Sequence, residues 1–133
     1  MENKKYQIFI SSTYTDLIEA RQKVRDTILS LYHFPLGMEM FSADDDEQWE
    51  VIRETIDCSD YYVLIIGGRY GSETSDGISY TENEYDYAKS KGIPVLAFIR
   101  DRNTALRPEE RESDSNKIEK LDKLDRKSTR LNS

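Results

Sequence analysis

The chain's clearest helix-to-strand pattern is SYTENEYDYAKSKGIPVLAF, residues 79–98. Its opening Ser-Tyr-Thr supplies candidate N-cap residues, and Gly92 stands where a helix would end. The apolar run that follows, residues 94–99, is typical of a strand. The first helical turn carries two carboxylates, Glu82 and Glu84. The segment therefore predicts a helix with an acidic start that leads into a buried strand.

Three segments upstream repeat this alternation of strand and helix. Runs of β-branched and aromatic residues predict strands at residues 6–10, 34–41 and 61–66, the last apolar enough to be buried on both faces. Apolar residues at spacings of three and four predict one helix that begins near Asp16, with Thr15 or Asp16 as its N-cap. A second helix is introduced by the acidic residues 44–46. This order predicts an α/β fold with one parallel sheet and helices on both faces.

The charge of the chain limits its ligands. Of 133 residues, 26 are Asp or Glu and 19 are Lys or Arg, which gives a formal net charge of −7. Residues 1–99 contain 18 acidic and 9 basic residues, a balance of −9, and such a surface argues against nucleic-acid binding. The sequence shows no membrane span and no signal peptide, and its single cysteine excludes an internal disulfide. We therefore expect a cytoplasmic protein.

Residues 100–133 differ in composition from the acidic part. They contain 10 basic and 8 acidic residues, with weak helical spacing at Ile118, Leu121 and Leu124. We expect one domain over residues 1–99, and a linker or the start of a truncated helix over residues 100–124. The ending DRKSTRLNS, residues 125–133, matches an in-frame translation of a common sequencing adapter. We expect this ending not to be native and the domain to be truncated at its C-terminal side.

Polar residues follow three elements of the predicted sheet. In open parallel sheets, ligands bind at the carboxyl ends of the strands. The polar segments expected there are residues 11–14, residues 67–72 and the helix start at residues 79–84. The first offers serine hydroxyls, and the second, GGRYGS, offers glycine amides and a guanidinium that suits phosphate. The alternative is structural, with serines that cap a helix and glycines that form a tight turn.

Glu82 and Glu84 cannot both face one pocket, because residues two apart lie about 200° apart around a helix. Two capping registers are compatible with the sequence. If Ser79 is the N-cap, Glu82 closes the capping box and Glu84 is free to act on a ligand. If Thr81 is the N-cap, Glu84 is the structural residue. The sequence pattern leaves both registers open.

Three other residues fit structural roles. His33 has no partners in the sequence with which to form a metal site or a catalytic triad. Cys58 lies in a predicted helix beside Ile56, and we expect it to be a small packed residue and not a nucleophile. Trp49 stands at helical spacing with Ile52, so we expect it in the core.

Several separated blocks resemble one family of domains. They are KKYQIFISSTYTDLIEAR, GMEMF, QWEVI, IDCSDYYVLIIGGRYGS and DGISYTENEYDYAKSKGIPVLAF, and they fall within residues 4–99. In this order they resemble a TIR-like domain of unknown function, which is found at the N-terminus of large proteins ahead of NACHT or related STAND signalling NTPase modules. The resemblance implies a flavodoxin-like fold.

The wider superfamily of TIR domains and nucleoside deoxyribosyltransferases cleaves N-glycosidic bonds of NAD or nucleosides with a helix glutamate. SYTENE, residues 79–84, resembles the TIR pattern S-W-C-x-x-E in spacing, with Tyr and Thr in place of Trp and Cys. EYDYA, residues 84–88, is similar to the E-x-G-Y-A segment of the deoxyribosyltransferases, with Asp86 in place of the glycine. Both comparisons imply Glu84 as the catalytic residue.

The resemblance implies two functions of different kinds. The first is cleavage of NAD or a nucleotide by a domain that self-associates and is controlled by a downstream NTPase module. NAD would be a substrate, and we expect no cofactor and no metal. The expected ligand-binding residues are Ser11, Ser12, Gly67, Gly68, Arg69, Tyr70, Ser79 and Glu82. The second function is that of a non-catalytic module that assembles through protein–protein contacts.

Overall fold

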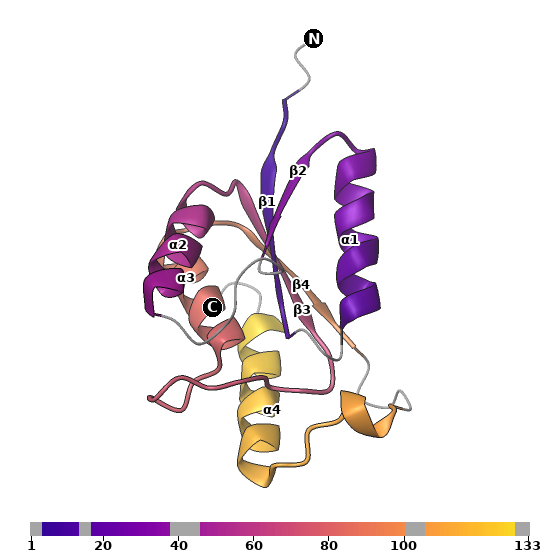
Figure 1. Cartoon of the computed structure of the whole chain (residues 1–133), viewed down its shortest axis with the longest axis vertical. Coiled ribbons are helices and arrows are strands. Elements are labelled where there is room, and N and C mark those ends of the chain that lie inside the picture. The colour runs from indigo at the N-terminus through magenta and orange to yellow at the C-terminus, as the bar shows by residue number, and fades with distance from the viewer. Residues whose placement is uncertain (1–3, 14–16, 38–45, 101–105, 130–133) are drawn as a thin grey trace.

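The computed structural model describes residues 4–13, 17–37, 46–100 and 106–129. Within these ranges the chain is an α/β fold with one four-stranded sheet (Figure 1). The strands are β1 (Gln7–Ser12), β2 (Phe34–Gly37), β3 (Tyr61–Ile66) and β4 (Val95–Ile99). The helices are α1 (Ile18–Ser30), α2 (Asp46–Asp57), α3 (Tyr80–Ser90) and α4 (Ser115–Thr129), with a 3-10 helix, η2 (Pro108–Glu110).

The sheet has the strand order β2-β1-β3-β4, and every neighbouring pair is parallel. This is a flavodoxin-like arrangement, so the predicted fold class is confirmed. The chain moves from β1 outward to β2 and then returns to the other side of β1 to form β3. In sheets of this kind, the point where the strand order reverses is where ligands bind, at the carboxyl ends of the strands.

The two faces of the sheet form hydrophobic cores of different size. Helices α2, α3 and α4 cover one face and α1 covers the other (Figure 1). On β1, Phe9 belongs to the larger core under the three helices and Ile10 to the smaller core under α1. This alternation follows from the two-residue period of a strand. Burial of both apolar sets stabilises the sheet between its helices.

Three predicted boundaries can be compared with the bounds of the described elements. Strand β1 continues through Ser12, because Ser11 and Ser12 remain in register with β3. The N-cap of α1 is Leu17, and the predicted N-caps, Thr15 and Asp16, lie outside the described residues. Strand β2 ends at Gly37, and the rest of the strand predicted over residues 34–41 lies outside the described residues.

The weak apolar spacing in the tail corresponds to α4. Leu121 and Leu124 lie in the larger core, whereas Ile118 is 42% exposed. Lys127, in the same helix, forms ion pairs with Glu82 and Asp86 at 2.6 and 2.7 Å. The domain boundary at residue 99 and the adapter origin of residues 125–133 stay predictions.

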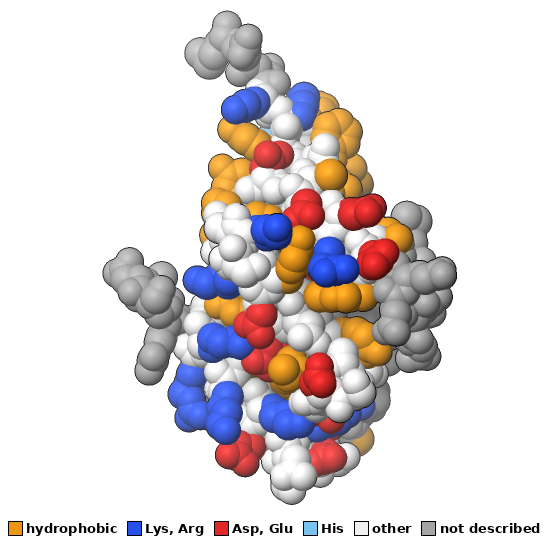
Figure 2. Space-filling model, turned by 90° about the vertical axis from the view of Figure 1, so that its left-hand side faces the viewer, with side chains coloured by type: hydrophobic (Ala, Val, Ile, Leu, Met, Phe, Trp, Pro, Cys, Tyr) orange, Lys and Arg blue, Asp and Glu red, His pale blue; other side chains and the backbone are white. Residues whose placement is uncertain are grey.

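Acidic and basic side chains are interspersed over the described part of the face that α2 and α3 form (Figure 2). Lys and Arg are most frequent toward the end of the molecule where α4 and η2 lie (Figure 2). Among the residues that the structure describes, no helix has the length and apolar composition needed to cross a membrane.

Candidate functional site

The start of α3 decides between the two capping registers. Ser79 is the N-cap, and its hydroxyl oxygen accepts a hydrogen bond from the N–H of Glu82 at 3.1 Å. Glu84 therefore has no capping duty, and only 2% of its surface is exposed. It lies on the side of α3 that faces the sheet, together with the buried Ala88 one turn later.

The carboxyl group of Glu84 meets the end of β1. Oε1 of Glu84 accepts a hydrogen bond from the hydroxyl of Ser11, with an oxygen–oxygen distance of 2.9 Å. Burial raises the pKa of Glu84 to about 8, although the Ser11 hydrogen bond and the positive charge of Arg21 act in the opposite direction. The structure thus holds a largely neutral carboxylic acid at pH 7. It lies at the carboxyl end of the strand where the sheet order reverses.

Arg21, on α1, binds polar groups at the same end of β1. Its side chain is buried, and Nη1 donates hydrogen bonds to the hydroxyl of Ser12 at 2.9 Å and to the carbonyl of Ile10 at 3.4 Å. A Cβ atom on Gly37 would lie 3.0 Å from the Nη2 atom of Arg21, so this glycine leaves room for the guanidinium at the end of β2. Sequence reasoning missed Arg21. The available signal was a charged residue within the apolar stripe of a helix, between Leu17 and Val24.

Tyr62 on β3 brings a further buried hydroxyl to the same region. The side chain is 0% exposed, and its hydroxyl forms no hydrogen bond with the described residues. Burial raises the pKa of Tyr62 well above its usual value, and the negative charge of Glu84 acts in the same direction, whereas the nearby Ser11 hydroxyl, which does not reach hydrogen-bond geometry, acts in the opposite direction. Glu84, Ser11, Ser12, Arg21 and Tyr62 form what we call the Glu84 cluster.

Tyr70, Ser79 and Glu82 form a separate junction below the start of α3. The hydroxyl of Tyr70 accepts a hydrogen bond from the N–H of Ser79 at 3.0 Å and donates one to Oε1 of Glu82 at 2.6 Å. Burial and the Glu82 hydrogen bond raise the pKa of Tyr70 to about 12. The Glu82 N–H bonds directly to the Ser79 hydroxyl, as in a capping box, whereas the Tyr70 hydroxyl stands between the Ser79 N–H and the Glu82 carboxylate, which would otherwise bond directly. These three residues, all predicted to bind a ligand, thus bond to one another through side-chain and main-chain groups.

The glycine turn after β3 packs against a later part of the chain, residues 106–112. A Cβ atom on Gly68 would lie 2.2 Å from the carbonyl oxygen of Glu110, so only glycine fits there. The carbonyl of Gly68 accepts a hydrogen bond from the N–H of Glu112 at 2.9 Å. The N–H of Tyr70 donates to Oε2 of Glu112 at 3.1 Å. Two polar groups of the turn that was expected to hold a phosphate therefore bond to Glu112.

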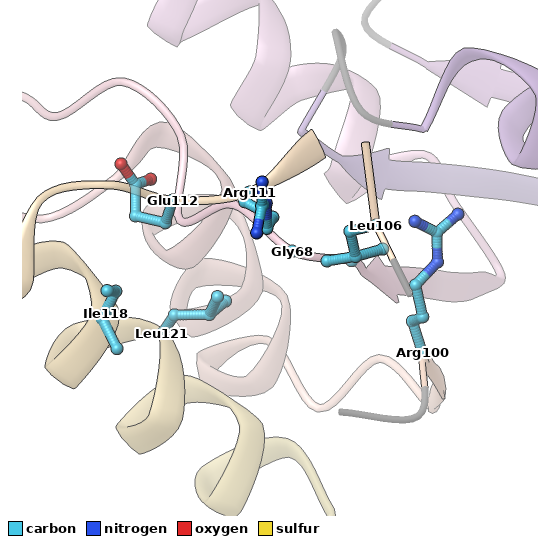
Figure 3. A pocket seen from close by; sticks show the side chains of 8 residues that line it. Gly68, Arg100, Leu106, Arg111, Glu112, Ile118 and Leu121 are labelled. Atoms are coloured by element: carbon cyan, nitrogen blue, oxygen red, sulfur yellow. The ribbon is translucent and has the colours of Figure 1, made fainter. Parts of the chain in front are cut away.

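A cavity of about 170 Å³ remains beside this turn (Figure 3). Its polar lining comes from Gly67, Gly68, Arg100, Arg111 and Glu112, and Leu121 is among its apolar residues. Arg69, the predicted phosphate ligand, is half-buried and is not among the lining residues. Sequence reasoning missed Arg100, Arg111 and Glu112, because nothing in a charged tail indicates that it returns to a glycine turn.

The residues expected to be structural have the following surroundings. Nδ1 of His33 accepts a hydrogen bond from the N–H of Tyr6 at 3.1 Å, and Trp49 packs against the larger core. The expectation that Cys58 is packed is wrong, because it follows the end of α2 and is exposed. The residues described contain no group of three or more His, Cys, Asp or Glu side chains that could hold a metal ion.

The sequence matches one family along nearly its whole length. The sequence model of a family described as "Domain of unknown function (DUF4062)" matches residues 7–132. The chain belongs to this family. The matched range begins with β1 and extends beyond α4, and it includes the Glu84 cluster, the glycine turn and residues 106–112. No curated protein matches the chain. The family description states no activity, ligand or partner.

Proposed function

We propose that this DUF4062 domain cleaves the N-glycosidic bond of NAD or of a related nucleotide, with Glu84 as its catalytic carboxyl group. The observation that carries the proposal is the buried hydrogen bond between Glu84 and Ser11 at the carboxyl end of β1. A carboxyl group whose pKa is raised to about 8 in such a place is a candidate for acid–base or electrostatic catalysis. The resemblance of residues 79–84 to the TIR glutamate pattern supports the same choice.

The reaction requires that positive charge on the ribosyl carbon be stabilised. As the C–N bond breaks, the nitrogen base leaves with the electron pair and the sugar acquires oxocarbenium character. An ionised Glu84 would stabilise this charge, and water would then add to the carbon and release a proton. The cationic nicotinamide ring of NAD would lower the pKa of Glu84 and favour its ionised form. Ser11 would hold one carboxyl oxygen in place, which fixes the orientation of the group.

The test is nicotinamide release from NAD by the concentrated protein, measured by chromatography, with and without enforced oligomerisation. We expect Glu84→Gln to reduce the rate at least about 1,000-fold, since the charge that stabilises the transition state is lost. Gln still accepts the Ser11 hydrogen bond, so the fold should persist. Asp86→Asn is the matched control from the same helix, since the side chain of Asp86 is 48% exposed and lies outside the proposed site, and we expect it to retain activity. An inactive wild-type protein, or a Glu84→Gln variant that remains as fast as wild type, would contradict the proposal.

A second candidate function is that of an assembly module, without catalysis, in a larger signalling protein. It is favoured by an apolar groove of about 580 Å³ between α1 and β4, whose lining includes Val24, Ile28 and Val63. Leu96 and Phe98 on β4 also line it and are 55% and 54% exposed. A parallel sheet is normally covered on both faces, so such a groove is suited to a protein partner.

Self-association can be measured by analytical ultracentrifugation over a range of concentrations. If copies of the domain associate through this groove, Phe98→Glu should weaken association at least about 10-fold, because a charge would be buried without a partner. Phe34→Glu is the matched control, since Phe34 is also 54% exposed but lies on β2 at the opposite edge. A protein that is monomeric at all concentrations, or equal effects of both substitutions, would argue against assembly through this groove.

A further inference from the structure

We propose that the cavity beside Gly68 is a binding site for a phosphate group, and that the carboxylate of Glu112 holds part of this site until phosphate displaces it. The proposal concerns binding alone and does not depend on cleavage by Glu84. It rests on the cavity, on the two arginines that line it and on the position of the Glu112 carboxylate.

The cavity lies where this fold brings strand ends together. Gly67 and Gly68 directly follow β3, and Arg100 directly follows β4, so the cavity opens at the carboxyl edge of the sheet. Residues 106–112 close it from the other side, and α4 contributes an apolar wall that includes Leu121 (Figure 3). A volume of about 170 Å³ is smaller than that of sites for drug-sized ligands, about 300–1,000 Å³. The space therefore suits one compact group, not an entire dinucleotide.

The two arginines of the cavity are held differently. Nη1 of Arg100 lies 3.2 Å from Oε2 of Glu110, and Arg107 donates to the other oxygen of that carboxylate. These hydrogen bonds lower the pKa of Glu110, so it is a stable counter-ion that fixes the position of Arg100. Arg111 also lines the cavity, and no carboxylate among the described residues forms an ion pair with it. A guanidinium group of this kind is well matched to phosphate, which it can bind through two parallel hydrogen bonds.

Glu112 lines the same cavity and places its carboxylate against a main-chain amide of the glycine turn. Its main-chain N–H donates to the carbonyl of Gly68 at 2.9 Å, and its Oε2 accepts from the N–H of Tyr70 at 3.1 Å. The chain thus supplies its own anion to an amide of the turn after β3. No arginine or lysine among the described residues pairs with this carboxylate. A phosphate group has more acceptor oxygens and more negative charge, so it would bind the same amide together with the guanidinium groups.

The experiment is a titration of the ¹⁵N-labelled protein with inorganic phosphate, followed by NMR at the amides of Gly68 and Tyr70. We expect Glu112→Gln to bind phosphate about 10-fold more tightly, a change of about 1.4 kcal/mol, because a like charge is removed. Gln can keep the Tyr70 hydrogen bond, so the turn should stay intact. We expect Arg111→Ala to weaken binding about 10-fold. The matched control is Glu119→Gln, which removes a carboxylate from the exposed surface of α4.

ADP-ribose in a parallel titration distinguishes the two sources of phosphate. If ADP-ribose binds more tightly than inorganic phosphate at the same amides, the natural ligand is a nucleotide phosphate. If the two bind equally, the ligand is the free anion. Either result supports the site. The proposal is overturned if sodium chloride of equal ionic strength produces the same shifts, or if Glu112→Gln and Arg111→Ala bind as wild type. Glu84→Gln should bind phosphate normally, so failure of the cleavage proposal and failure of this one are distinguishable.

Discussion

Two carboxylates near the carboxyl edge of the sheet, Glu84 and Glu112, have opposite surroundings. Glu84 is enclosed between α3 and β1, and one serine hydroxyl donates to it. Glu112 lies at a cavity that two arginines line, and a main-chain amide donates to it. Burial makes Glu84 a proton-holding group, whereas the position of Glu112 makes it a substitute for an external anion. Two glutamates thus differ in chemical behaviour because one is buried in the core and the other lies at a cavity lined by arginines.

The largest loss of stability is expected from a substitution in the glycine turn, near Glu112. Gly68→Ala should lower the free energy of unfolding by about 3 kcal/mol, because the new methyl group would overlap the backbone of residues 106–112. Gly92→Ala is the matched control. Gly92 has a φ of 73° and no atom within 4 Å of an added Cβ, so it should cost only about 1 kcal/mol of backbone strain. Urea denaturation measures both, and equal costs would show that residues 106–112 do not pack against the turn.

The Glu84 cluster is expected to make stability depend on pH. Folding raises the pKa of the Glu84 carboxyl group from 4.5 to about 8. Its contribution to the free energy of unfolding is therefore complete below pH 4.5, where the group is protonated in both states. This contribution is lost as the pH rises toward 8, since the folded state must then ionise a buried group. Glu84→Gln lacks the titration and should be more stable than wild type by about 2–3 kcal/mol at pH 7. Thermal denaturation at several pH values tests this, and equal pH slopes for both proteins would contradict it.

The elements of the fold could be predicted from local patterns. Strand β3 is apolar throughout because both its faces are buried, and that composition is visible in six consecutive letters. The choice of Glu84 over Glu82 also agrees with the observed register, since Ser79 is the N-cap. The sequence is compatible with both registers, however, and the bonds of Tyr70 to Ser79 and Glu82 accompany the one that the structure adopts.

The surroundings of the candidate sites could not be predicted, because they join residues far apart in the chain. Ser11 and Glu84 are separated by 73 positions, and Tyr70 and Glu112 by 42. No local periodicity reports such a contact. Glycine in GGRYGS indicated a close approach of some other atom, but not whether a ligand or the chain itself would make it. For Gly68, the atom that approaches is the carbonyl oxygen of Glu110.

The smallest changes in stability are expected when either of two buried tyrosine hydroxyls is removed. That of Tyr70 bonds to Ser79 and Glu82, so Tyr70→Phe should cost about 1–2 kcal/mol and leave the buried N–H of Ser79 unsatisfied. That of Tyr62, in the Glu84 cluster, has no hydrogen-bond partner among the described residues. Tyr62→Phe should therefore be neutral or stabilise the protein by up to about 1 kcal/mol, since an unpaired polar group is removed from the core. Chemical denaturation of both variants provides the comparison. A clear loss of stability in Tyr62→Phe would show that this hydroxyl does bond within the cluster, and its spare donor could then not be offered to a substrate beside Glu84.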